Sequence, residues 1–487
     1  MRDLAVEYRH RPDHVAVIDD SGEYRARWLD SRARQLADAI AAGGTVLVQA
    51  DNSWRTVVAA LAVGLGDGVL AVVNRHTTRA EFAAAVEDIE PDMVIAEPSA
   101  VDEWAVAGER APVLDGWSAV RTGGPREVSR WAGGRFIGLT SGSTGRAKGV
   151  VQSEEALRYA CARTIEVNGL APGDAVAAIV PLSSTAAFCF GVYLSLLLGG
   201  PLVLMDRWDP QRAAARLAET DARWTMCVPT MALQLAATGR PVPGLRSVTV
   251  GGGPMDRAAL ARAEQALGTR ILRVFGMSEC LGHTSPSPDD PEEVRLGRDG
   301  RPFAGTDLRA VSASGAVLGP GETGHAQVRG PSLFLGYARG GKVEPPALTA
   351  DGYFPTGDLL MAHEDGTVTI MGREKDVIIR GGRNIDITEI ERAVAGHPRV
   401  AQACVVPLPD DMLGERIALL AVSGDGGEIS LAEITGFLGD GGLSKTKWPE
   451  FVFTVDALPQ TKVGKLDRAG ARALVRGLNA SGTAAPR

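Results

Sequence analysis

The stretch GLTSGSTGRAKGVV, residues 138–151, gathers glycines and hydroxyl side chains around one lysine, Lys148. The residues FIGL (136–139) predict a strand, and residues 153–167 predict a helix capped by Ser153. A glycine-rich turn in such a place lets backbone N–H groups approach an anion closely, and hydroxyl groups add donors. The spacing is not that of a Walker loop, which needs Gly-Lys followed by Ser or Thr.

Lysine is the rarer strong base in this chain, because seven of the 51 Lys and Arg residues are Lys. An ammonium group is a compact charge that can follow a moving phosphate, whereas a guanidinium group favours fixed two-point geometry. Lys148 is therefore a candidate phosphate-binding cation. The alternative for a bare Ser/Gly stretch is an ordinary surface loop.

The composition limits the classes of partner. The 487 residues carry a net charge of −8, which gives no general attraction to nucleic acid or to an anionic membrane. Five dispersed Cys fit a reducing compartment, and the N-terminus lacks the features of a signal peptide, so we expect a cytoplasmic protein. Residues 175–205 carry no charge, but Pro and Gly interrupt them, so they predict strand, loop, buried helix and strand rather than a membrane span.

Two patterns of predicted secondary structure follow one another along the chain. Short β-branched runs alternate with helical stretches up to about residue 300, with strands predicted at 45–50, 69–74, 92–97, 200–205, 224–230 and 247–252. This alternation is typical of parallel sheets covered by helices. Dense Gly and Pro then predict a small β-rich subdomain. The expected fold is α/β, with a large N-terminal domain of helix-covered sheets plus the β-rich subdomain (1–374) and a small mobile α+β lid (375–487). In the lid, Thr388 and Glu391 have the spacing of a capping box.

Seven motifs occur in a fixed order: TSGSTGRAKG (140–149), GGGPM (251–255), FGMSE (275–279), GYFPTGDL (352–359), GREKD (372–376), GGRNIDITEIE (381–391) and PQTKVGKLDR (459–468). Together they resemble the adenylate-forming enzymes, the superfamily of acyl-CoA synthetases, adenylation domains and luciferases. The resemblance spans nearly the whole chain. It implies that a carboxylate attacks the α-phosphate of ATP to give acyl-AMP and pyrophosphate, and that a thiol then takes the acyl group.

The resemblance also implies roles for individual residues. Lys465 would bridge the carboxylate and the α-phosphate, Glu279 would hold Mg²⁺ with Thr144, and Lys148 would contact phosphates. Asp358 would accept the ribose hydroxyls, with Arg373 beside it. The remaining nucleotide-binding candidates are Thr140, Ser141, Gly142, Ser143, Gly252, Gly253, Pro254, Phe275, Gly276, Met277 and Ser278.

The same resemblance places Lys375 at the hinge of the lid, and Gly381 and Gly382 at the tunnel for the thiol. The acyl pocket would be bordered by Ser184, Phe188, Cys227, Val250 and Gly251. In PLSSTAAF (181–188), Ser184 stands where the family often has His, which leaves volume in the pocket. No acidic residue occurs in residues 184–200 to pair an ammonium group, so we expect an uncharged, bulky acid rather than an amino acid.

The expected activity is an ATP-dependent, AMP-forming carboxylate–CoA ligase with ATP, Mg²⁺ and CoA as its small molecules. One alternative is an enzyme that passes the acyl group to a carrier protein or a partner enzyme. Another is a nucleotide-binding module without turnover, which the presence of Lys465, Glu279 and Asp358 argues against. The chain is compatible with a homodimer.

Overall fold

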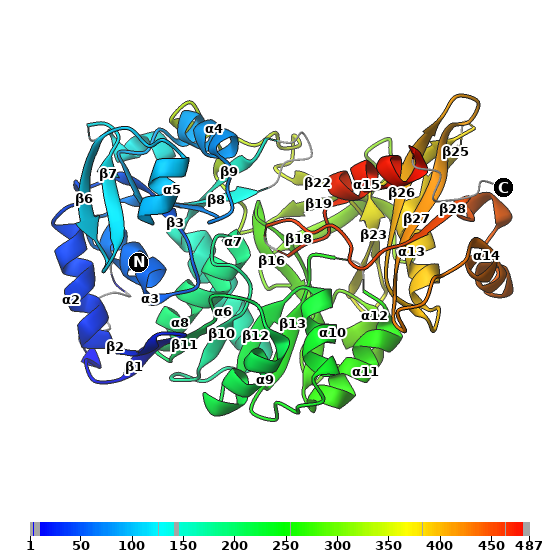
Figure 1. Ribbon diagram of the computed structural model, residues 1–487, viewed down its shortest axis with the longest axis horizontal. Coiled ribbons are helices and arrows are strands. Elements are labelled where there is room, and N and C mark those ends of the chain that lie inside the picture. Colours follow the sequence, from blue (N-terminus) through cyan, green and yellow to red (C-terminus); the bar gives the residue numbers. More distant parts are fainter. Residues whose placement is uncertain are drawn as a thin grey trace. The chain divides into compact units, whose positions relative to one another are not determined.

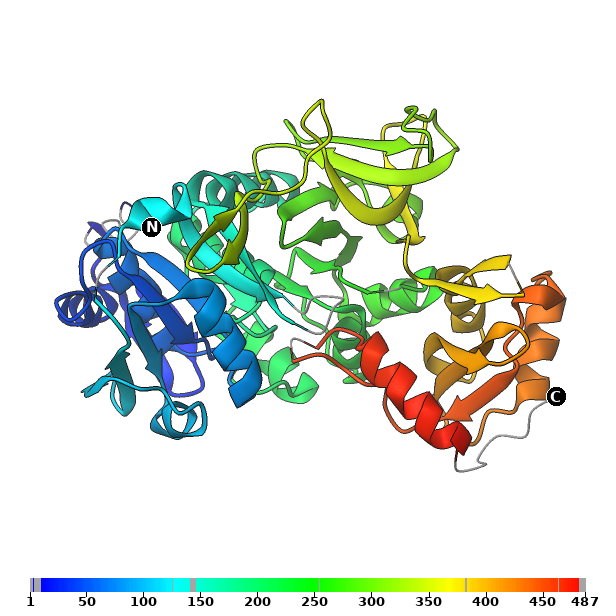
Figure 2. The ribbon, with the colours of Figure 1, turned by 90° about the horizontal axis from the view of Figure 1, so that it is seen from above.

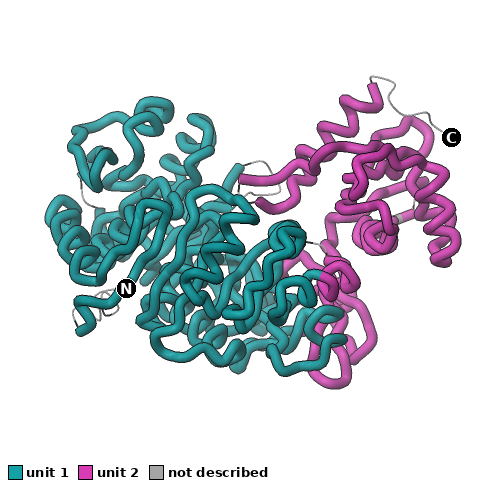
Figure 3. Tube along the Cα trace, turned by 60° about the horizontal axis from the view of Figure 1, so that its bottom comes forward, with its two compact units in different colours: residues 1–251, 263–308, 328–354 teal, residues 252–262, 309–327, 355–487 magenta. Residues whose placement is uncertain are grey.

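The computed structural model describes residue 3 and residues 10–124, 126–140, 146–253, 255–381, 383–462 and 464–480 (Figure 1). It divides into two units, coloured separately in Figure 3. The first comprises Met1–Gly251, Ala263–Leu308 and Val328–Phe354, and the second comprises Gly252–Arg262, Arg309–Gln327 and Pro355–Arg487. The boundary at residues 374 and 375 stays a prediction.

A seven-stranded sheet of the first unit carries residues 247–250, which lead into the GGGPM motif. Its strand order is β14 (Arg270–Arg273), β13 (Ser247–Val250), β12 (Trp224–Cys227), β10 (Val176–Ala178), β11 (Leu202–Leu204), β1 (Val15–Asp19) and β2 (Gly22–Arg25). All neighbours are parallel except β1 and β2. Helices α9 (Pro210–Glu219) and α10 (Pro229–Ala237) lie along this sheet (Figure 1). Because parallel strands end on one edge, β13 delivers its following glycines to the carboxyl edge.

A nine-stranded sheet of the first unit carries the hairpin around the glycine-rich stretch. Its order is β21 (Lys342–Glu344), β20 (Gly336–Arg339), β9 (Lys148–Ser153), β8 (Gly134–Thr140), β4 (Val69–Val73), β3 (Thr45–Gln49), β5 (Met93–Ala96), β7 (Trp117–Arg121) and β6 (Glu109–Val113). The central strands β8, β4, β3 and β5 are parallel. They are wholly or largely buried, as expected for β-branched runs covered on both faces.

The helices of the first unit follow the strands as the sequence predicts. They are α2 (Ala26–Ala37), α3 (Trp54–Leu65), α4 (Arg79–Ile89), α5 (Pro98–Glu103), α6 (Glu154–Asn168), α7 (Thr185–Ala187), α8 (Leu194–Leu198) and α12 (Glu292–Gly297), with a 3-10 turn at Val128–Trp131. Ser153 caps α6 by accepting from the Ala156 N–H, as predicted. Helix α11 (Arg257–Leu267) contributes residues to both units.

Residues 175–205 form strand β10, a loop, a buried helical segment and strand β11, which confirms the prediction. The middle of that segment, Phe188–Tyr193, is a π-helix. Within the described residues, no helix combines the length and the apolar character that crossing a membrane requires.

Two small sheets follow in the chain. The first unit has a three-stranded sheet of β15 (Phe275–Met277), β16 (Cys280–Ser285) and β17 (Arg301–Pro302). The predicted β-rich segment is a sheet of β18 (Asp307–Val311), β19 (Thr323–Arg329), β22 (Phe354–Ala362) and β23 (Val368–Arg373), seen among the yellow-green strands of Figure 2. Most residues of this sheet belong to the second unit.

The C-terminal part of the second unit is a five-stranded sheet with helices, as predicted. Its strands are β24 (Val377–Arg380), β25 (Arg383–Asp386), β26 (Val400–Asp410), β27 (Gly414–Ser423) and β28 (Phe451–Thr454). Its helices are α13 (Ile387–Ala395), α14 (Leu431–Asp440) and α15 (Arg468–Ala480), with a 3-10 turn at Lys445–Lys447. Apolar residues of β24, β26, β27, α13 and α14 form one core, and residues of β26, β27, β28 and α15 form a second.

The capping box predicted at Thr388 and Glu391 is wrong. Asp386 caps α13, because its carboxylate accepts from the Thr388 N–H at 2.7 Å. Glu391 is buried instead and pairs with Arg468 at 2.7 Å, while it also accepts from the Val405 N–H at 2.8 Å. Because its carboxylate pairs with Arg468, Glu391 does not cap the helix.

Candidate active site

The opening glycine-rich stretch is held between two paired strands. Strand β8 ends at Thr140 and β9 begins at Lys148, and these two residues are register partners. The Thr140 hydroxyl lies 3.4 Å from the Lys148 carbonyl oxygen. Strand β9 stands between the stretch and helix α6, where the sequence did not indicate a strand. The predicted phosphate ligands Ser141, Gly142, Ser143 and Thr144 lie outside the described residues.

Lys148 and Glu279 contact the same tyrosine side chain, Tyr337. The Nζ atom of Lys148 lies 4.9 Å from the centre of the Tyr337 ring, which is within the range of a cation–π contact. The Tyr337 hydroxyl donates to Oε1 of Glu279 at 2.9 Å. Burial, together with the Glu279 charge, raises the pKa of Tyr337, so the hydroxyl keeps its proton and remains a donor. A cation and an anion thus flank one side chain.

Sequence reasoning missed Tyr337, which lies in β20. Strand β20 pairs with β9 in antiparallel register, and Tyr337 is the partner of Val150. The available signal was the dipeptide Gly336-Tyr337, a glycine beside an aromatic residue in a short β run, but nothing local links it to Lys148.

Two backbone contacts position the FGMSE motif, which forms the turn between β15 and β16. The Gln152 side chain donates to the Ser278 carbonyl at 2.7 Å, and the Phe334 N–H donates to the Glu279 carbonyl at 2.7 Å. Gln152 lies in β9 and is fully buried, so the turn is tied to the strand that begins at Lys148. Both contacts fix the direction in which the Glu279 side chain leaves the turn.

The other residues of this motif lie on a close pair of strands. Phe275 pairs with Thr284, and Met277 pairs with Cys280. A Cβ at Gly276 would lie 3.2 Å from the Gly282 nitrogen, so glycine permits this close approach.

The predicted acyl-pocket residues fall on neighbouring elements of the first unit. Cys227 and Val250 are register partners in β12 and β13, and Gly251 follows directly. Burial raises the pKa of Cys227 to about 12, which keeps the thiol neutral. Ser184 precedes α7, and Phe188 is fully buried and stacks on Phe136 with ring centres 4.4 Å apart. Their roles at a pocket stay predictions.

Asp358 and Arg373 are brought together by the second unit. They are register partners in β22 and β23, and Oδ1 of Asp358 lies 3.2 Å from Nε of Arg373. The Asp358 side chain is 4% exposed, and its Oδ2 atom finds no hydrogen-bond partner among the described residues. Burial raises its pKa, against the lowering effect of the Arg373 charge. A buried carboxylate oxygen without a protein donor fits a ligand hydroxyl.

Lys465 lies in a short turn of the second unit. The Thr461 N–H donates to the Lys465 carbonyl at 2.6 Å, and the Thr461 hydroxyl accepts from the Lys465 N–H at 3.1 Å. In the same unit, a Cβ added at Gly252 would lie 3.0 Å from Cε of Lys465. Gly252 has φ +82°, a conformation that favours glycine. Gly253 follows it, while Pro254 lies outside the described residues.

The predicted hinge and thiol-tunnel residues flank β24. Lys375 lies in the turn between β23 and β24, where the Asp376 N–H donates to the Arg373 carbonyl at 3.0 Å. Gly381 has φ +55° at the turn between β24 and β25, and Gly382 lies outside the described residues. No described contact tests these two roles.

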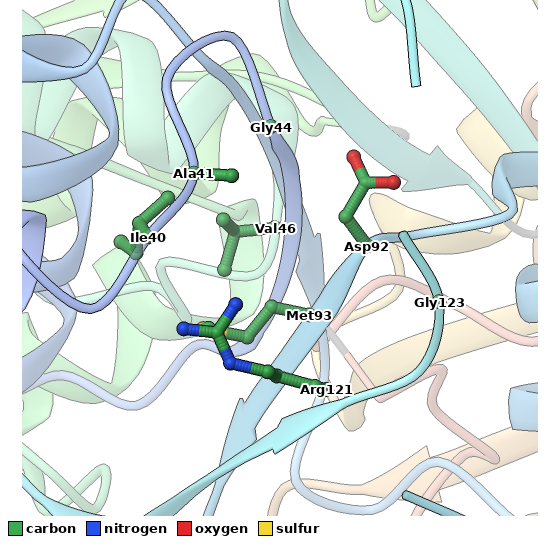
Figure 4. A pocket seen from close by; sticks show the side chains of 8 residues that line it. All are labelled: Ile40, Ala41, Gly44, Val46, Asp92, Met93, Arg121 and Gly123. Atoms are coloured by element: carbon green, nitrogen blue, oxygen red, sulfur yellow. The ribbon is translucent and has the colours of Figure 1, made fainter. Parts of the chain in front are cut away.

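A separate pocket lies near the starts of β3 and β5 (Figure 4). The residues predicted for the active site, as far as the structure describes them, do not border it. Oδ2 of Asp92 accepts from the Thr45 N–H at 2.8 Å, and Oδ1 lies 3.3 Å from Nη1 of Arg126. Both oxygens of the Asp92 carboxylate therefore have partners within the chain, which is a structural role. The lining residues are Ile40, Ala41, Gly44, Val46, Asp92, Met93, Arg121 and Gly123.

Known proteins match the chain along most of its length. The sequence model of the AMP-binding enzyme family matches residues 4–338, and that of the AMP-binding enzyme C-terminal domain matches residues 389–465. Triostin synthetase I of Streptomyces triostinicus is 38% identical over 341 residues, which are 69% of this chain and 64% of that protein. The match therefore spans less than two thirds of triostin synthetase I.

Two further relatives match nearly the whole chain. A salicylyl-CoA synthase / salicylate adenylyltransferase of a Streptomyces species is 30% identical over 509 residues, covering 96% of this chain and 91% of that protein. The crystal structure of ATP-bound MatB from Rhodopseudomonas palustris has a TM-score of 0.86 at 26% identity, covering 98% of this chain and 99% of that one. The chain therefore belongs to the AMP-binding enzyme family, the adenylate-forming ligases that its motifs resemble.

Proposed function

We propose that the protein is an ATP-dependent, AMP-forming carboxylate–CoA ligase that activates an uncharged, bulky organic acid. The observation that carries the proposal is that two residues of opposite charge contact Tyr337. Lys148 lies over its ring, and Glu279 accepts a hydrogen bond from its hydroxyl. A metal–phosphate complex needs a cation near phosphate oxygens and a carboxylate near the metal. This short arrangement offers both.

The residues fit a Mg²⁺ ion that arrives with ATP rather than a resident one. Glu279 offers one carboxylate, and in the described part of the chain no group of three or more His, Cys, Asp and Glu residues is placed to hold a metal. Glu279, with Thr144 as the proposed second ligand, would hold the ion against the phosphates. There the ion would neutralise phosphate charge.

Asp358 and Arg373 would bind the ribose in this proposal, since one buried oxygen of Asp358 has no donor among the described residues.

Lys465 would face the carboxylate and the α-phosphate during the first step. The carboxylate oxygen bonds to the α-phosphorus, the bond to the bridging oxygen breaks, and pyrophosphate leaves. In the second step the thiol sulfur bonds to the acyl carbon, the bond from that carbon to the phosphate oxygen breaks, and AMP leaves while the thiol proton passes to solvent.

The proposed acid is uncharged because residues 184–200 contain no carboxylate to pair a substrate ammonium. A buried ammonium without a partner costs several kcal/mol, which corresponds to a discrimination of about 10² or more. An apolar pocket with room for a bulky acid would contribute to binding roughly 25 cal/mol per Å² of apolar surface that the acid buries. The name of the salicylyl-CoA relative supports a ring acid as the substrate.

ATP–pyrophosphate exchange with a panel of amino acids, acetate, benzoates, medium-chain acids and polycyclic acids tests the first step. Exchange with a bulky acid supports the proposal. Preference for an amino acid contradicts the charge argument, preference for acetate contradicts the volume argument, and exchange with no acid contradicts the activity itself.

Mass spectrometry of the acyl product then tests the second step with free CoA and, in parallel, with a carrier protein whose prosthetic-group thiol is free. Formation of acyl-CoA supports the ligase. Acyl transfer to carrier protein alone supports the alternative, a carrier-loading enzyme.

A further inference from the structure

Asp88 is a buried carboxylate that pairs with two arginines from distant parts of the chain. It lies in the last turn of α4, and its side chain is 7% exposed. Arg146 approaches it in two-point geometry, with Nε 3.2 Å from Oδ2 and Nη2 3.1 Å from Oδ1. Nη1 of Arg339 lies 3.3 Å from Oδ1 and 3.2 Å from Oδ2. Charge-assisted pairs of this kind are among the stronger hydrogen bonds of proteins.

Both arginines are close in sequence to residues of the candidate active site. Arg146 precedes Lys148 by two residues, and Arg339 follows Tyr337 by two residues in β20. Lys148 and Tyr337 are the two residues joined by the cation–π contact. The two segments that carry this contact are therefore also the two segments that the carboxylate of Asp88 holds.

Asp88 joins these segments where the backbone pairing between them stops. The ladder that the structure describes between β9 and β20 ends at the pair Gly149 and Ala338. Past that pair, the carboxylate accepts from Arg146 on one chain and from Arg339 on the other. Without its negative charge, two guanidinium groups would face one another and repel. The carboxylate thus keeps the two chains together beyond the end of the ladder.

The position of Asp88 is itself fixed by the core. Helix α4 packs against β9 (Figure 1) and against β20, and its residues Phe82 and Ala85 share a hydrophobic core with Val151 of β9. The Gly341 N–H donates to the Asp88 carbonyl at 3.1 Å, which attaches the end of the helix to the turn after β20. The helix C-terminus also carries partial negative charge, which attracts the same arginines.

We propose that Asp88 is a positioning residue for ATP, which acts through Arg146 and Arg339 to hold Lys148 against Tyr337 before the phosphates arrive. The inference rests on the proposed function, which places phosphates at Lys148. It assigns a role to a residue that touches neither ATP nor the acid. Because the phosphates beyond the α-phosphate leave as pyrophosphate, Asp88 acts in the first half-reaction and not in the second.

Calorimetric binding of ATP and of AMP to the full chain, with Mg²⁺ and without an acid, tests this role. Asp88→Asn removes the charge and keeps the size of the side chain. It should weaken ATP binding about tenfold or more, the effect of weakening one charged contact to a phosphate. Binding of AMP, which lacks the outer phosphates, and thiolysis of supplied acyl-AMP should not change. A general loss of stability would not separate ATP from AMP.

Asp92→Asn is the matched control, because Asp92 is also 7% exposed and also pairs with an arginine, Arg126, at 3.3 Å. Its other partner is the Thr45 N–H of β3. This variant should lower the free energy of unfolding and leave the ratio of the ATP and AMP affinities unchanged. Arg339→Gln alters a side chain that is 41% exposed, and it serves if Asp88→Asn does not fold. It should show the same selective loss of ATP binding.

A double-mutant cycle separates a shared role from independent ones. If Arg146 acts through Asp88, Arg146→Gln should weaken ATP binding in the wild type and have little further effect in Asp88→Asn. Additive losses overturn the proposal. Unchanged ATP binding in a folded Asp88→Asn variant, or equal losses for ATP and AMP, overturns it as well.

The failure of this proposal is distinguishable from failure of the proposed function, because the binding measurements need no acid. If the wild type exchanges pyrophosphate and Asp88→Asn binds ATP as the wild type does, the role of Asp88 is refuted and the ligase stands. If no acid supports exchange, the ligase is refuted, and the comparison of ATP with AMP still decides whether Asp88 positions the phosphate site.

Discussion

Tyr337 touches two residues of opposite charge, and its hydroxyl and ring serve different contacts. Tyr337→Phe removes the hydrogen bond to Glu279 and keeps the ring beneath Lys148. We expect kcat/KM for ATP to fall about 10- to 100-fold, because a hydrogen bond to a charged group contributes about 1.5–3 kcal/mol. Tyr337→Leu should lower kcat/KM for ATP further, since it also removes the cation–π contact with Lys148. Pyrophosphate exchange at varied ATP measures both, and a wild-type value for Tyr337→Phe would exclude a positioning role.

His283, a fully buried residue of β16, predicts a pH dependence of stability. Burial lowers its pKa to about 4, against the raising effect of a hydrogen bond to the Cys280 backbone, while an unfolded histidine titrates near 6.5. Between these values the unfolded chain takes up the proton and the folded chain does not. The wild type should therefore lose stability as the pH falls from about 6.5 to about 4, by roughly 1.4 kcal/mol per pH unit. Above pH 6.5 this contribution is complete.

Urea denaturation of the wild type and of His283→Leu at several pH values checks this sign. The variant lacks the titrating group, so the midpoint difference between the two proteins should change across pH 6.5 to 4 and stay constant above it. A constant difference over the whole range would mean that His283 does not stay neutral in the folded chain.

At the scale of elements, the turn between β23 and β24 carries the proposed hinge. Lys375→Pro fixes φ near −65°, and the described hydrogen bonds of this turn use the N–H groups of Glu374 and Asp376, which the substitution keeps. If the backbone rotates at Lys375, adenylation should survive and thioester formation should fall strongly. Lys375→Ala, which keeps the rotation, is the control. Equal loss of both half-reactions in a folded variant would argue against a hinge there.

Strand β9 and the first turn of helix α13 show where local sequence signals mislead, although helix α13 itself was predicted. β9 holds the residues KGVVQS, whose strand character is masked locally by the glycines before it, and pairing with β8 and β20 on its two sides makes it a strand. The capping box at Thr388 fits the local rule, yet Arg468 is 77 residues away in sequence from Glu391 and takes its carboxylate. Local signals predict elements, and distant partners decide between competing local options.

At the scale of the whole molecule, the two half-reactions should respond oppositely to two substitutions. Lys465→Ala should lower acyl-AMP formation about 10²–10³-fold and spare thiolysis of supplied acyl-AMP, because a preorganised charge is lost only where negative charge develops. Lys375→Pro should do the reverse. Lys462→Ala, in the same motif, is the control for Lys465. Single-turnover assays of each half-reaction measure the effect, and near-normal adenylation by Lys465→Ala would exclude the assigned role.

The family, the α/β class and the order of the chemical motifs follow from the amino-acid sequence without any structure. These properties depend on short runs, such as 138–151 and FGMSE, and on the alternation of strand and helix patterns. Each of these signals involves only residues that are close together in the sequence. Only the folded structure shows that Tyr337 meets Glu279, 58 residues away, and that His283 is fully buried. The reason is that strand pairing brings distant segments together, and no local period of the sequence encodes which strands will pair.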